Sequence, residues 1–89
     1  MQKVRMELIH PTAMQVCIGG TFNAWRPAVT PMIALDQGLW VKDLMLAPSQ
    51  YEYRLVVDGV WMPDPQADET APNPYGEMNS VLKVNGGTR

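Results

Sequence analysis

The sequence predicts an all-β domain, an antiparallel β-sandwich of about seven strands. Three observations support this fold class. Apolar residues alternate with polar ones in several short segments, which is the period of a strand with one buried face. Turn-forming residues (Gly, Pro, Asn and Asp) separate these segments at short intervals. No stretch of the chain repeats its apolar residues with the period of an amphipathic helix.

The first two strands are expected before the first long loop. Apolar and charged residues alternate from Lys3 to Leu8, which predicts a half-buried strand that ends at His10-Pro11. Residues 15–20 form the second expected strand, which Gly19-Gly20 ends.

Three further strands are expected in the middle of the chain. Residues 32–35 form a short strand, and the turn at residues 36–38 leads into a longer strand at residues 39–46. After a second turn, residues 50–57 form the next strand. Alternation along these strands, together with the loop pattern, predicts a core that includes Phe22, Trp40, Tyr53 and Leu55.

The strongest local signal is Asp58-Gly59, which stands between two alternating runs. A two-residue type I′ turn needs φ > 0 at both central positions, and Asp-Gly meets that need. The turn would pair Val56 with Trp61, and paired residues share a face, so Trp61 would lie outward near Arg54. The opposite, core-facing set is then Tyr51, Tyr53, Leu55, Val57, Val60 and Met62.

The last part of the chain is expected to contain a loop, one strand and a frayed end. Residues 63–75 are rich in proline, which cannot donate to a β-ladder, so an irregular loop is predicted. Residues 80–84 form the last expected strand, and Asn79 opens it with an outward side chain. Fraying is expected from about residue 85, and residues 1–89 are expected to form a single domain.

Composition excludes several functional classes. The chain of 89 residues has 7 basic and 9 acidic residues and a net charge of −2, so nucleic-acid binding through phosphate contacts is not expected. With 1 cysteine and 1 histidine, neither a disulfide framework nor a metal site is expected, and no cofactor is implied. Cys17 is expected to be an inert core thiol. The first residues contain no long apolar run, which predicts no signal peptide, no membrane partner and a cytoplasmic setting.

Catalysis is not expected, and no catalytic residue is predicted. Asp64, Asp68 and Glu69 could supply the two carboxyl groups that a glycosidase uses. They lie in the proline-rich segment, however, and so small a sandwich is not expected to enclose a cleft around them. No Ser-His-Asp set can be assembled around His10, which precedes Pro11 in an expected turn.

Five segments carry a resemblance by their order and approximate spacing: Gly20-Thr-Phe-Asn-Ala-Trp25, Gly38-Leu-Trp40, Tyr51-Glu-Tyr-Arg-Leu-Val-Val-Asp-Gly-Val-Trp61, Asp64-Pro65 and Asn79-Ser-Val-Leu-Lys-Val84. Together they resemble carbohydrate-binding module family 48. This family includes the glycogen-binding domain of the AMP-activated protein kinase β subunit and the N-terminal early-set domains of isoamylases and branching enzymes in glycoside hydrolase family 13. The resemblance implies an immunoglobulin-like β-sandwich of the early-set type.

The resemblance also implies a carbohydrate site made of Trp25, Arg54, Trp61, Tyr75 and Asn79. The two indoles would stack on α-glucosyl rings, because one face of the sugar carries C–H groups of partial positive charge and the indole face is negative. Arg54 and Asn79 would hydrogen-bond to sugar hydroxyls. For each indole the alternative is packing, with Trp61 in the core or Trp25 as a cap on its loop.

The polar site residues have alternatives of their own. Arg54 could be a solvated strand charge, or could pair with Glu52 or Glu77. Asn79 could cap a turn, and Tyr75 could pack against the protein and not stack on sugar. Glu77 departs from the hydroxyl residue found in the kinase-type pattern, which affects the hydrogen bonding expected at the site.

Three functions fit the sequence. The first is non-catalytic binding of an α-glucan of the glycogen or starch type. The second is a structural early-set domain that packs its tryptophan face against the catalytic barrel of a family 13 hydrolase. The third is a regulatory protein-interaction module of the kinase β-subunit type. The joint presence of Trp25, Arg54, Trp61 and Asn79 favours the first function, because a structural spacer does not need all four.

Overall fold

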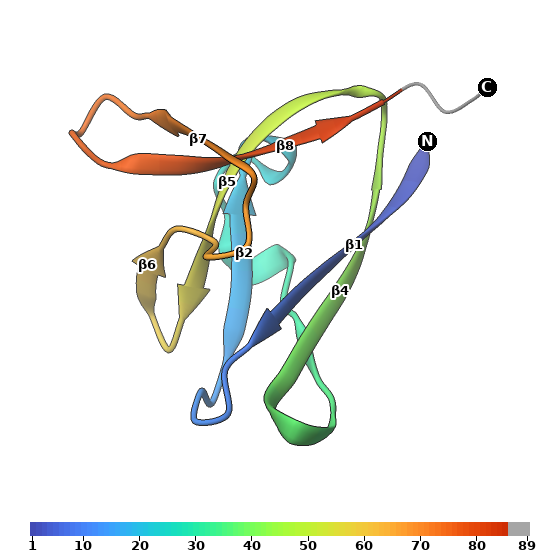
Figure 1. The fold of residues 1–89 in the computed structure, drawn as a ribbon, viewed down its shortest axis with the longest axis vertical. Coiled ribbons are helices and arrows are strands. Elements are labelled where there is room, and N and C mark those ends of the chain that lie inside the picture. The colour runs from blue at the N-terminus through green and yellow to red at the C-terminus, as the bar shows by residue number, and fades with distance from the viewer. Residues whose placement is uncertain (86–89) are drawn as a thin grey trace.

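The computed structural model describes residues 1–85, which form two antiparallel β-sheets (Figure 1). The all-β sandwich is confirmed. The first sheet has the order β1-β4-β3, with β1 at Gln2–Ile9, β4 at Leu39–Leu46 and β3 at Ile33–Ala34. The second sheet has the order β2-β5-β8-β7, and β6 also pairs with β5. Its strands are β2 at Val16–Gly20, β5 at Ser49–Val57, β6 at Val60–Met62, β7 at Glu69–Pro72 and β8 at Met78–Val84.

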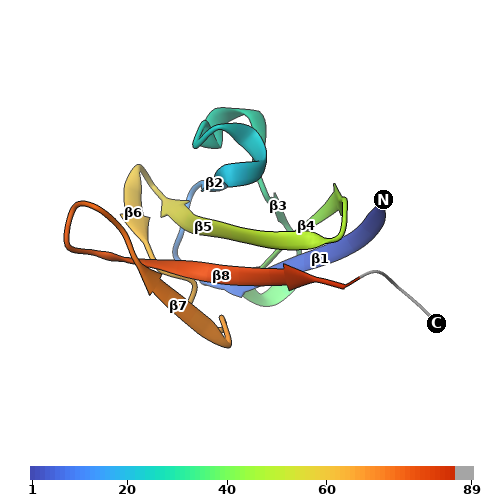
Figure 2. The ribbon, with the colours of Figure 1, turned by 90° about the horizontal axis from the view of Figure 1, so that it is seen from above.

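The two sheets pack face to face around one core (Figure 2). Trp40, Tyr53 and Leu55 are buried in it, and the partly buried Phe22 packs against it, as the alternation predicts. Helical structure in residues 1–85 is limited to three short 3-10 turns, at Thr21–Asn23, Pro27–Val29 and Asp36–Gly38. The buried core cluster consists of Met6, Leu8, Val16, Ile18, Met32, Trp40, Leu44, Leu46, Tyr53, Leu55, Val57 and Val84.

The hairpin between β5 and β6 has the predicted turn and register. Asp58 and Gly59 have φ angles of 49° and 84°, and Trp61 lies opposite Val56. Trp61 therefore shares the outer face of the second sheet with Arg54. The core position expected for Val60 is wrong, because its side chain is 65% exposed. Its pairing is as predicted, but the tip of the hairpin projects away from β1 and β4, so no opposing sheet covers it (Figure 1).

The proline-rich segment is not wholly irregular, as had been expected, because it contains β7. This strand pairs with β8 from Glu69 opposite Val81 to Pro72 opposite Met78. Since β7 lies at the edge of the sheet and Pro72 is its last residue, the missing proline N–H disrupts no central ladder. β8 accordingly begins at Met78, before the expected start.

The two ends of the described chain lie close together. The Gln2 side-chain amide donates a hydrogen bond to the backbone carbonyl of Asn85. The frayed end expected from about residue 85 falls mainly on residues 86–89, which lie outside the described part of the chain. Within residues 1–85, no helix has the length and apolar character needed to cross a membrane.

Cys17 is buried, as expected, but on the outer face of the second sheet. It lies opposite Val56 of β5 and forms an isolated bridge with Pro31. Burial raises the pKa of its thiol, so the nucleophilic thiolate form is disfavoured.

Candidate functional site

A groove on the outer face of the second sheet brings together all five residues of the predicted site. Its volume is about 610 Å³. Three segments build it: the loop after β2, the β5–β6 hairpin and the β7–β8 hairpin. Both hairpins project to the side of the molecule away from β1 and β4 (Figure 1). We call this the aromatic groove; its lining residues are Trp25, Arg54, Trp61, Asn73, Pro74, Tyr75, Glu77 and Asn79.

Trp61 reaches across the sheet to a notch left by a glycine. Gly19 in β2 pairs with Arg54 in β5, and Trp61 in β6 pairs with Val56 on the opposite side of β5. A Cβ atom on Gly19 would stand 2.6 Å from Cη2 and 2.7 Å from Cζ3 of the indole, closer than two carbon atoms can approach. The absence of a side chain at Gly19 therefore lets the ring lie close to the sheet, and Trp61 stays 39% exposed.

Trp25 is held by a strained loop. Ala24 and Trp25 both have left-handed backbones, with φ angles of 57° and 58°, and this conformation costs a residue other than glycine about 1 kcal/mol or more. The Trp25 N–H donates to the Gly20 carbonyl at 2.9 Å. The conformation thus depends on hydrogen bonds that fix the loop.

Asn23 supplies most of those hydrogen bonds. Its Oδ1 accepts from the backbone N–H groups of Gly20 at 3.0 Å and of Arg26 at 3.2 Å. Its Nδ2 donates to the Ile18 carbonyl and to Thr30 Oγ1, both at 2.9 Å. One side chain therefore ties both ends of the loop to each other and to β2.

The two exposed indoles form a tilted pair. The ring centroids of Trp25 and Trp61 are 6.4 Å apart, and the ring planes meet at 46°. Trp25 is 37% exposed, so each ring offers surface to the groove. Neither indole belongs to the core cluster, which excludes the packing alternative for Trp61.

Replacement of Asn23 by alanine is expected to destabilise the loop at residues 20–30 more than the sheets. Without the Asn23 amide, the left-handed conformations of Ala24 and Trp25 lose the contacts that stabilise them. We expect the free energy of unfolding to fall by about 2 kcal/mol, and amide exchange at residues 20–30 to accelerate more than in β5. Hydrogen exchange measured by NMR tests this, and unchanged exchange in the loop would contradict it.

Arg54 is largely covered and is paired with Glu77. Its side chain is 12% exposed, Nη1 donates to the Glu77 carboxylate, and Nη2 lies 3.5 Å from the Trp61 carbonyl. The Nε atom is buried without a partner among the described residues. Of the alternatives that the sequence left open, the structure shows the pair with Glu77, whose side chain is 58% exposed.

Asn79 points outward, as expected, but is buried beneath the β7–β8 turn. Its Nδ2 donates to Glu52 Oε1 at 3.0 Å, and its Oδ1 accepts from Asn73 Nδ2 at 3.2 Å. Asn73 Oδ1 in turn accepts from the N–H groups of Tyr75 at 2.9 Å and Glu77 at 3.0 Å. Asn79 and Asn73 thus support a turn that presents Tyr75, which is 88% exposed, beside the indole pair.

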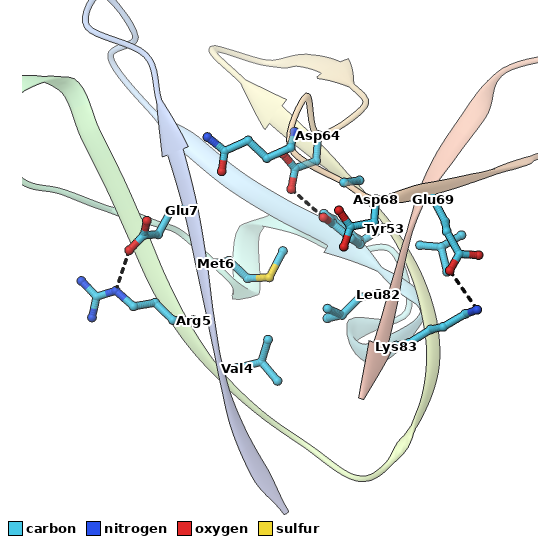
Figure 3. Close-up of a pocket in the computed structure, with 13 residues that line it drawn as sticks. Val4, Arg5, Met6, Glu7, Tyr53, Asp64, Asp68, Glu69, Leu82 and Lys83 are labelled. Carbon is cyan, nitrogen blue, oxygen red and sulfur yellow. Dashed lines mark hydrogen bonds and ion pairs between the residues drawn. The ribbon is translucent and has the colours of Figure 1, made fainter. Parts of the chain in front are cut away.

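A second cavity, of about 360 Å³, lies between β1 and the β7–β8 side of the sandwich (Figure 3). It contains the carboxylates that were considered for catalysis. Asp64 Oδ2 accepts a 2.5 Å hydrogen bond from the Tyr53 hydroxyl, and its Oδ1 accepts from the Gln66 N–H. Glu69 pairs with Lys83 at 2.8 Å. Asp64 is therefore engaged in buried hydrogen bonds, and Glu69 in an exposed ion pair. No group of three potential metal-ligating side chains occurs in the described residues.

Tyr53→Phe is expected to destabilise the fold because it leaves the buried Asp64 carboxylate without its hydroxyl donor. We expect a loss of about 1–3 kcal/mol in urea unfolding. Tyr51→Phe on the same strand is the matched control: it removes a hydroxyl bonded to the Ala47 carbonyl at 2.6 Å near the surface, and should cost less. Equal losses would contradict the structural role of the Tyr53–Asp64 pair.

The hydrogen bond between Tyr53 and Asp64 leads us to expect that the domain loses stability at alkaline pH. Burial, the hydrogen bond to Asp64 and the charges of Asp64 and Asp68 raise the pKa of Tyr53 far above its ordinary value. The raised pKa contributes stability that is complete below the unfolded-state pKa near 10 and is lost as pH rises above it. Unfolding midpoints should therefore fall above about pH 10, and less steeply in Tyr53→Phe.

Comparison with known proteins places the chain in a class of carbohydrate-binding modules. The family model described as the glycogen recognition site of AMP-activated protein kinase matches residues 5–88, and the chain belongs to this family. The predicted resemblance is thereby confirmed, and membership identifies a carbohydrate-binding type of domain whose family description is glycogen recognition.

Two curated relatives match most of the chain but only a small part of their own length. The chain is 29% identical over 75 residues to "Phosphoglucan phosphatase DSP4, amyloplastic" of Castanea sativa. The aligned region covers 84% of the chain and 20% of the phosphatase. The chain is 33% identical over 72 residues to "Protein FLOURY ENDOSPERM 6, chloroplastic" of Oryza sativa subsp. japonica. This aligned region covers 81% of the chain and 13% of that protein. The chain therefore spans about a fifth or less of each relative.

Three residues that position the site were not among those predicted for it. They are Gly19, Asn23 and Asn73. Gly19 leaves room for the Trp61 ring, whereas Asn23 and Asn73 hold the turns that carry Trp25 and Tyr75. The sequence pattern at Gly19-Gly20 predicts the end of a strand, although a glycine inside a strand also signals a close approach by another group. Asn23 and Asn73 begin turns, for which asparagine is typical, but the sequence does not show how many backbone groups each would bind.

Proposed function

We propose that the aromatic groove binds an α-glucan chain of the glycogen or starch type, with Trp25 and Trp61 as the stacking residues. The observation that carries this proposal is the tilted, half-exposed indole pair, whose two members are fixed by the Gly19 notch and the Asn23 turn. A curved α-linked chain presents successive sugar faces at an angle, and two tilted rings match that curvature better than one flat surface does. Family membership supports the same ligand class.

The chemistry of the groove suits a neutral polyhydroxylated ligand. The indole faces attract the C–H side of each glucosyl ring. Glu77 and the phenol of Tyr75 lie at the same groove and offer hydrogen-bonding groups to hydroxyls. An open site with few hydrogen bonds is expected to bind weakly, with a Kd of roughly tens of micromolar to millimolar, and to gain from repeated units along a polymer.

Other expectations from the sequence stay predictions. These are the single-domain organisation over residues 1–89, the cytoplasmic setting, and any association with a family 13 barrel or a kinase-type partner. The names of the two relatives contain the words amyloplastic and chloroplastic, and these locations are theirs. The phosphatase activity named for one relative is not proposed for this chain, because the match covers 20% of that protein.

Native gel electrophoresis with embedded polysaccharide tests the proposed function. We expect glycogen and amylopectin to retard the chain, and a soluble β-linked glucan to leave its mobility unchanged. A variant with both Trp25→Ala and Trp61→Ala should migrate equally in all gels. Equal mobility of the unmodified chain with and without α-glucan would overturn the proposal.

A further inference from the structure

We propose that Glu77, held in place by Arg54, is the charged group that meets the glucan, and that it makes the groove selective for neutral chains over phosphorylated ones. This inference rests on the proposed function, because it concerns the same groove. It reverses the roles expected from the sequence, where Arg54 was the sugar ligand and Glu77 an unexplained departure from the family pattern.

The first reason is the difference in exposure between the two partners. The Arg54 side chain is 12% exposed and the Glu77 side chain is 58% exposed, so the anion lies nearer to a ligand in the groove than the cation does. One Glu77 oxygen is occupied by Arg54 Nη1. The other oxygen has no hydrogen-bond partner assigned to it in the described residues, and it can accept a hydrogen bond from a sugar hydroxyl.

The second reason is that Arg54 is already committed. Nη1 bonds to Glu77, Nη2 contacts the Trp61 carbonyl, and Nε is buried. Arg54 is thus a positioning residue that holds Glu77 on one side of the groove and the backbone of Trp61 on the other. Because its side chain is only 12% exposed and Nη1 already pairs with the Glu77 carboxylate, the guanidinium offers a phosphate little accessible surface.

The third reason is the composition of the groove lining. Among its described residues, Arg54 is the only cation and Glu77 the only anion. Both side-chain amides of the lining already donate within the protein: Asn73 Nδ2 to Asn79 Oδ1 at 3.2 Å, and Asn79 Nδ2 to the Glu52 carboxylate at 3.0 Å. Glu52 adds negative charge behind the groove. A neutral hydroxyl group meets a good acceptor here, whereas a phosphate monoester of charge about −1.5 to −2 meets a like charge.

Maltoheptaose, and maltoheptaose phosphorylated on several of its glucose units, are the two probes. In calorimetric titrations at low salt we expect the neutral chain to bind about fivefold more tightly. Glu77→Gln should remove most of this preference and weaken neutral binding about twofold to threefold, because an amide oxygen is a poorer acceptor than a carboxylate. High salt should also reduce the preference of the unmodified chain, since like-charge repulsion is screened.

Glu7→Gln is the matched control. Glu7 also pairs with an arginine, Arg5, at 3.1 Å, and is 47% exposed, but it lies on the first sheet and does not line the groove. Glu7→Gln changes the net charge by the same amount as Glu77→Gln and should keep the fivefold preference for neutral maltoheptaose. Equal or tighter binding of the phosphorylated chain by the unmodified protein would overturn the inference and leave the proposed function intact. Failure of neutral maltoheptaose to bind would overturn both.

Discussion

Trp61→Ala is expected to lower the affinity of the chain for maltoheptaose about 30-fold in calorimetric titrations. A loss of this size corresponds to about 2 kcal/mol, which is typical of an aromatic residue at the centre of a binding surface. The ring is 39% exposed and lies outside the core cluster, so its removal should affect binding more than folding.

Ile33→Ala is a suitable control for this variant. Ile33 is 60% exposed on β3 of the other sheet, so the change also removes exposed apolar surface but leaves the groove untouched. We expect its affinity to match that of the unmodified chain. If Trp61→Ala binds as well as Ile33→Ala, the indole is not a ligand for sugar.

Gly19→Ala is expected to reduce affinity at least tenfold although the substituted residue does not line the groove. The added methyl group would stand 2.6 Å from Cη2 of Trp61, so the indole must move. Because the clash is with the far end of an exposed side chain and not with backbone, the sheet can keep its structure while the ring tilts away. The expected result is a near-normal melting temperature with weak binding.

A double-mutant cycle separates this effect from a general disturbance of β2. Gly19→Ala acts through Trp61, so it should cost little further affinity when Trp61 is already alanine. Calorimetry on the two single variants and the double variant measures this coupling. Additive losses would show that Gly19 affects binding by another route.

The outward position of Trp61 beside Arg54 is predictable from the local turn residues. Asp58-Gly59 fixes the register of β5 against β6, and register alone decides that Trp61 and Arg54 face outward together. The same local logic placed Trp40, Tyr53 and Leu55 in the core. Periodicity succeeds here because each of these strands has one face covered by the opposite sheet.

The sequence does not predict the structure correctly, or leaves it open, where the position of a residue depends on distant parts of the chain. Val60 has the predicted pairing but lies where no strand of the other sheet covers it. β7 forms because β8 offers a free edge, which proline content alone does not reveal. The partner of Arg54 could be narrowed to Glu52 or Glu77, but the choice depends on how the β7–β8 turn folds over the sheet.

The three tryptophans permit one direct measurement of the central claim. In a proton–nitrogen NMR titration with maltoheptaose, the indole N–H signals of Trp25 and Trp61 should shift together along one binding curve. The signal of Trp40 should stay in place, because this ring is 8% exposed and its Nε1 donates to the His10 carbonyl at 3.1 Å. A β-linked oligosaccharide should shift none of them. Unmoved Trp25 and Trp61 signals at saturating maltoheptaose would contradict the account.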